Sequence, residues 1–156
     1  MYVVTTGVLL ALQCFVALFV GLHNWIPLGR LNDVKAARAE FPGSKLLTVT
    51  LIIFTPVAIG LVGSAVYFGR VYPGWLLWWL WIFYGLVCYG ALKEWWIPYF
   101  SQPTPERVAR NQAMYGATHA FLPERNGIRP NTLHVILDLV TLAILIALGL
   151  VTAQSR

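Results

Sequence analysis

Residues 74–96 read GWLLWWLWIFYGLVCYGALKEWW, an apolar stretch with a tryptophan group at each end. The second group, Trp95 and Trp96, follows Trp75 by about 20 residues, which at a rise of about 1.5 Å per residue is about 30 Å. That length matches the hydrocarbon core of a bilayer, and tryptophan is enriched at both membrane interfaces. The stretch therefore predicts a helix that crosses a membrane.

Three further apolar segments of similar length lie on either side of this stretch. A bilayer core needs roughly 20 apolar residues per helix, so each segment is long enough, or nearly long enough, to span it. Of the 156 residues, 58% are hydrophobic and only 11% are charged, which is beyond the composition of a soluble domain. We expect an all-α membrane protein, a four-helix transmembrane bundle that forms a single domain. Within residues 1–156, the spans are predicted at about residues 3–22, 46–69, 74–96 and 133–153.

Two polar loops, residues 23–45 and 97–132, connect these spans on the same side of the membrane. Each loop contains an amphipathic pattern that is typical of a helix lying in the membrane interface. Pro98 is expected to end the third span, because proline disrupts a helix interior. Capping residues indicate where the next helices begin. The interfacial helices are predicted from Asn32 to Phe41, capped by Asn32 or Asp33, and from Thr104 to Phe121, with Asn131 or Thr132 capping the fourth span.

The basic residues are distributed unequally between the two sides of this topology. Of the 11 lysines and arginines, only Arg70 and Arg156 fall on the side of the termini. The others lie in or beside the two loops, and an excess of Lys and Arg is typical of cytoplasmic loops. The pattern predicts a bacterial inner-membrane protein with both large loops in the cytoplasm and both termini in the periplasm.

The sequence also argues against two functional classes. The net charge of +5 is scattered over loops rather than along one helix face, so nucleic acid is not an expected partner. Cys14 and Cys88 lie in different apolar segments without a C-x-x-C pair, which argues against a thiol–disulfide oxidoreductase. The expected partners are membrane lipids and either a partner membrane protein or further copies of the chain.

The residues able to carry chemistry are concentrated between Lys93 and Asp138. His134 and Asp138 are four residues apart, hence on one helix face, where a carboxylate can orient an imidazole. A carboxylate at the centre of a bilayer costs roughly 2.5–3.5 kcal/mol, which suggests that Asp138 has a partner or a role. The topology brings the candidate site residues to one leaflet: His23, Glu94, His119, His134 and Asp138.

Three interpretations of this group remain open. It could be a metal site, in which His23, His134 and one of His119, Glu94 or Asp138 bind an ion such as zinc and leave a fourth position for water. His134, Asp138 and Glu94 are then the catalytic candidates. It could instead hold haem b between His23 and His134. In the third interpretation the group is structural and fixes the long loop onto the bundle, since buried polar groups are usually satisfied groups.

Four arginines of the long loop are candidates for binding lipid headgroups, because the planar guanidinium matches phosphate geometry. They are Arg107, Arg110, Arg125 and Arg129. The leading functional hypothesis is a non-catalytic accessory or assembly subunit whose long cytoplasmic loop docks a partner or lipid headgroups. The alternative is a small membrane enzyme, or a metal or haem carrier, that uses the histidines and acids named above.

Overall fold

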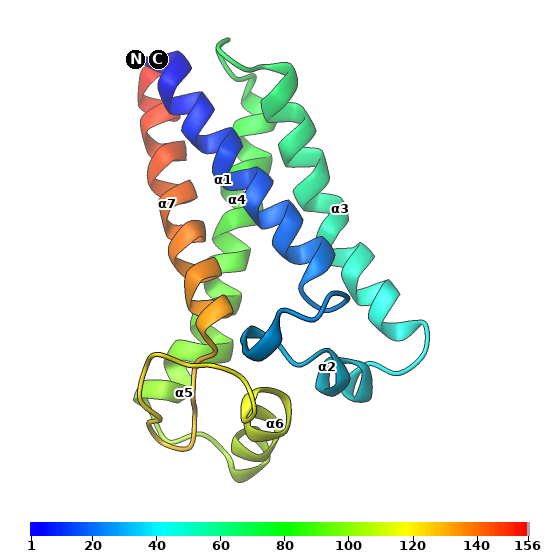
Figure 1. Cartoon of the computed structure of the whole chain (residues 1–156). Helices are drawn as coiled ribbons and strands as arrows, with labels where there is room; N and C mark the ends of the chain where they lie inside the picture. The colour runs from blue at the N-terminus through cyan, green and yellow to red at the C-terminus, as the bar shows by residue number, and fades with distance from the viewer. Residues whose placement is uncertain (156) are drawn as a thin grey trace.

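The computed structural model of the protein describes residues 1–155 and shows four long helices (Figure 1). All four are long and apolar enough to cross a membrane, and each packs against two of the others. Within residues 1–155 the only β-type pairing is an isolated bridge between Arg125 and Ile128. The predicted all-α membrane fold is therefore confirmed. The long helices are α1 (Tyr2–Leu22), α3 (Lys45–Val66), α4 (Gly74–Ala91) and α7 (Thr132–Gln154).

The core of the bundle is built from apolar side chains of all four helices, and two glycines of α3 allow close packing. A Cβ atom on Gly60 would lie 2.9 Å from the side chain of Leu80, and one on Gly63 would lie 2.7 Å from Leu76. Both leucines belong to α4 and are completely buried. The small residues of α3 therefore form a contact face inside the chain, between the second and third spans.

The third span is longer than the sequence predicted. From α4 the helix continues through a π-helical turn, η2 (Leu92–Trp96), into α5 (Ile97–Phe100). In η2 the N–H group of Ile97 bonds to the carbonyl of Leu92, five residues earlier. This wider turn accommodates Pro98, which has no N–H group and whose ring would clash with the preceding turn of an α-helix. The expectation that Pro98 ends the helix was wrong for this reason.

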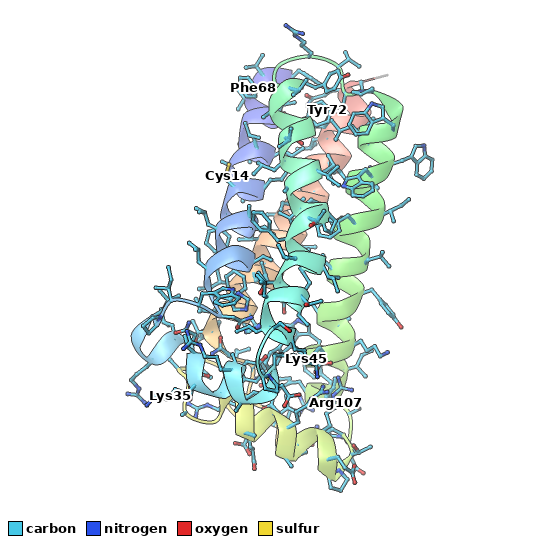
Figure 2. All side chains as sticks on the ribbon, turned by 90° about the vertical axis from the view of Figure 1, so that its right-hand side faces the viewer. Cys14, Lys35, Lys45, Phe68, Tyr72 and Arg107 are labelled. Atoms are coloured by element: carbon cyan, nitrogen blue, oxygen red, sulfur yellow. The ribbon has the colours of Figure 1, made fainter. Side chains whose placement is uncertain are left out.

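The two loops fold together at one end of the bundle, opposite the two termini (Figure 1). They contain η1 (Gly29–Leu31), α2 (Val34–Glu40), α6 (Pro105–Tyr115) and the irregular residues 116–131. We call these four segments the surface unit. In the side view, the labelled Lys35, Lys45 and Arg107 lie at this end, and Phe68 and Tyr72 lie at the other (Figure 2). The structure thus places both large loops on one side, as predicted.

The predicted interfacial helices are both present, with different ends. The side chain of Asp33 caps α2 by accepting from the N–H of Ala36 at 2.9 Å, and Thr104 caps α6. However, α6 ends at Tyr115 rather than at Phe121. The chain turns away there because the backbone N–H of His119 donates to the carbonyl of Arg30 in the first loop. A contact between two loops therefore overrides the helical pattern of residues 116–121.

Asn131 connects the two loops to the bundle. Its side-chain oxygen accepts from the N–H of Leu133 at 2.8 Å and so caps α7, as one of the two predicted caps. Its side-chain nitrogen donates to the carbonyl of Leu31 at 2.9 Å, across to the first loop. Asn131 is 2% exposed. One buried side chain thus fixes the start of a span and the relative position of both loops.

Candidate functional site

The charged residues of the surface unit are organised around Glu94, which η2 presents toward α6. The Glu94 carboxylate accepts from Nη2 of Arg107 at 2.6 Å and from Nη2 of Arg110. The same Nη2 of Arg107 donates to the carbonyl of Lys93 at 3.0 Å. That carbonyl has lost its ordinary helical partner, because the N–H of Ile97 bonds to Leu92 instead. The π-helical turn and α6 are therefore joined by charged hydrogen bonds.

A cavity of about 270 Å³ opens beside these ion pairs, between α2, η2 and α6. We call it the charged pocket. Four of its ten lining residues are charged and five are aromatic or apolar, and it lies at the end of the bundle that carries the loops. The lining residues are Glu40, Phe41, Glu94, Trp95, Arg107, Arg110, Asn111, Met114, Tyr115 and Ile128.

Two aromatic side chains form the inner wall of the charged pocket. The rings of Trp95 and Tyr115 pack with their centroids 4.7 Å apart, and Trp95 is 4% exposed. Burial raises the pKa of Tyr115 to about 12, and the nearby Glu94 carboxylate adds to the effect. The Tyr115 hydroxyl is therefore neutral at physiological pH and remains able to donate a hydrogen bond.

Behind this wall the two histidines of the spans lie together. The ring centroid of His134 is 5.0 Å from that of Trp95, 5.2 Å from that of Tyr115 and 5.9 Å from that of His23. His23 follows α1, and its Nδ1 is 2.8 Å from the carbonyl of Phe19. Burial lowers the pKa of His23, so its imidazole is neutral near pH 7. The structure thus gives a compact cluster of aromatic rings and imidazoles.

The other predicted site residues have separate partners. The carboxylate of Asp138 accepts from Nε1 of Trp96 at 2.9 Å, rather than from His134. His134 instead has its Nδ1 3.4 Å from the side-chain oxygen of Asn131. His119 lies on the loop, with its Nδ1 2.8 Å from the hydroxyl of Thr132. Of the predicted group, His23 and His134 pack ring against ring.

The space beside these two histidines is small. A cavity of about 20 Å³ is lined by both His23 and His134, which is room for about one water molecule and not for a haem. Haem b between the two rings therefore does not fit this packing. Among residues 1–155, no group of three or more His, Cys, Asp or Glu side chains lies close enough together to hold a metal ion.

The four predicted headgroup arginines divide into two pairs. Arg107 and Arg110 line the charged pocket. The guanidinium of Arg125 lies over the ring of Phe100, 5.2 Å from its centroid, and Arg129 is held through its backbone N–H, which donates to Asn111. The α6 pair is therefore the one placed at the charged pocket.

Sequence reasoning missed three components of the charged pocket: Glu40, Trp95 and Tyr115. Trp95 was assigned to the membrane interface alone, and nothing in the spacing of Tyr115 distinguished it from other aromatic residues. Glu40 did carry a signal, because an acid at the end of a helix opposes the helix dipole and calls for an explanation.

The class of the protein is clear from its four spans, which make it an integral membrane protein. Its activity cannot be taken from a relative. Comparison with known protein families, with curated proteins and with solved structures finds no match to this chain.

Proposed function

We propose that the protein is a non-catalytic accessory or assembly protein of a membrane, and that its surface unit docks lipid headgroups in the charged pocket. The observation that carries this proposal is the pair Arg107 and Arg110, held by one carboxylate beside a cavity at the end of four spans. A cavity of about 270 Å³ is large enough for the polar part of a phospholipid, and its position at the loop end of the four spans supports contact with headgroups.

The two guanidinium groups retain donors for a phosphate. Each arginine carries five N–H donors, and within the described residues only Nη2 of each is hydrogen-bonded. Guanidinium–phosphate pairs are strong because both groups are ionised and their geometries match. Glu94 holds both side chains in place, so less conformational freedom is lost when a ligand binds.

The pocket is assigned here to the cytoplasmic leaflet of a bacterial inner membrane, with both termini in the periplasm. This assignment is supported by the excess of Lys and Arg at the end of the surface unit. Anionic lipids in that leaflet would add a favourable interaction of about 1 kcal/mol for each nearby basic residue.

The direct test is retention of phospholipid by the purified protein, measured by native mass spectrometry after gentle detergent extraction. We expect wild type to retain phospholipid and Arg110→Gln to retain about 10-fold less, because a hydrogen bond to a charged group contributes about 1.5–3 kcal/mol. Arg38→Gln is the matched control, since Arg38 is exposed on α2 outside the pocket. Wild type without phospholipid, or equal retention by both variants, would contradict the proposal.

A further inference from the structure

One acidic residue of the charged pocket, Glu40, forms no ion pair with the arginines that line the same pocket. Glu94 accepts from both Arg107 and Arg110, whereas Glu40 has no ion pair among the described residues. Lys45, five residues further along the chain, has its ammonium 5.6 Å from the ring centroid of Phe41 instead. The four charged groups of the wall sum to zero, with a free carboxylate on α2 and the guanidinium groups on α6.

The position of Glu40 is unfavourable for the fold alone. It is the last residue of α2, where the negative end of the helix dipole repels a carboxylate. Glu40 is exposed and lines the cavity, so its carboxylate is available to a ligand that brings a positive charge.

The aromatic part of the wall suits the same positive group. Phe41 lines the pocket next to Glu40 in sequence, and the face of its ring attracts a cation, as the Lys45 ammonium 5.6 Å from its centroid shows. Because α2 and α6 are neighbours, a ligand in the cavity would meet the Glu40 carboxylate and the Phe41 ring at the end of α2, and guanidinium groups on α6.

We propose that the charged pocket binds an aminoalkyl phosphate of the phosphoethanolamine type, with its phosphate on Arg107 and Arg110 and its ammonium on Glu40. This rests on the proposed function and names the headgroup class that the pocket selects. A zwitterion has no net charge but carries separate positive and negative groups, and the charged residues of the pocket wall are arranged in the same way. The lipid form, phosphatidylethanolamine, is favoured as the source, because the pocket lies at the end of the membrane spans.

The test compares two lipids with identical acyl chains, phosphatidylethanolamine and phosphatidylglycerol, added to delipidated full-length protein and measured by native mass spectrometry. Phosphatidylglycerol offers a phosphate without an amine. We expect wild type to prefer phosphatidylethanolamine about 10-fold, Glu40→Gln to remove the preference without changing phosphatidylglycerol binding, and Arg110→Gln to weaken both. Glu124→Gln, an exposed acid of the loop outside the pocket, is the control.

The outcomes separate this inference from the proposed function. Equal binding of the two lipids by wild type, or an unchanged preference in Glu40→Gln, overturns the inference and leaves headgroup docking in place. Absence of both lipids overturns both. Soluble O-phosphoethanolamine, titrated by calorimetry, identifies the source: binding without acyl chains supports a free ligand, and binding only as the lipid supports the membrane form. Circular dichroism and thermal unfolding check that each variant is folded.

Discussion

At the scale of single residues, the polar groups of this protein are mostly used to fix backbone segments. Asn131 caps α7 and bonds to the first loop, His119 shares a hydrogen bond with the hydroxyl of Thr132, and Trp96 donates to Asp138. The caps were predictable, because a cap bonds to its own sequence neighbours. The partner of Asp138 was not, because Trp96 comes from another helix and is 42 residues away in sequence.

Asn131→Ala should lower the free energy of unfolding by about 1–3 kcal/mol, since it removes an N-cap and the part-buried hydrogen bond to the Leu31 carbonyl. Asn131→Asp retains the cap and loses the donor, so about half of that loss is expected. Reversible unfolding in mixed detergent micelles measures both values. A loss below about 0.5 kcal/mol for the alanine variant would show that this side chain does not fix the loops.

At the scale of elements, the π-helical turn η2 determines the directions in which the side chains of Glu94 and Trp95 point. It extends the third span past Pro98 and turns Glu94 toward α6 and Trp95 toward the aromatic cluster. A π-helical turn is not visible in hydrophobic periodicity, because its extra residue changes the register by only one position. The sequence therefore predicted the span and its tryptophans but not the faces on which Glu94 and Trp95 lie.

Pro98→Ala restores an N–H group and removes the ring that the wide turn accommodates. We expect the turn to relax toward an α-helix, which rotates Glu94 away from Arg107 and Arg110. Lipid retention should fall about 3–10-fold, while the free energy of unfolding changes by less than about 1 kcal/mol. Native mass spectrometry and chemical denaturation give the two values, with Pro103→Ala as the control. If Pro98→Ala retains as much lipid as wild type, the π-helical turn does not control lipid binding in the charged pocket.

At the scale of the whole molecule, the bundle has a basic end and a nearly uncharged end. The termini meet at the second of these, where the hydroxyl groups of Tyr2 and Ser155 lie 3.3 Å apart (Figure 1). The surface unit occupies the first, so the charged pocket and both loops lie at the same end of the bundle.

The orientation of this asymmetric bundle can be tested with single cysteines in intact bacterial cells. After Cys14 and Cys88 are replaced, Ser155→Cys should react with a membrane-impermeant maleimide, and Ser101→Cys should react only after the cells are lysed. The reason is that Lys and Arg are retained on the cytoplasmic side during insertion. The reverse labelling pattern would place the pocket at the periplasmic leaflet.

The sequence alone determined the class of the protein, the positions of its spans, the side shared by its loops and most helix caps. These depend on local composition and on bonds between near neighbours, which each segment carries with it. Only the tertiary structure decided that Glu94 meets two arginines of α6, that Glu40 faces the same cavity, and that Asp138 pairs with Trp96 rather than with His134. Those contacts depend on how each helix is rotated about its axis, which is set by the packing of all of its neighbours together.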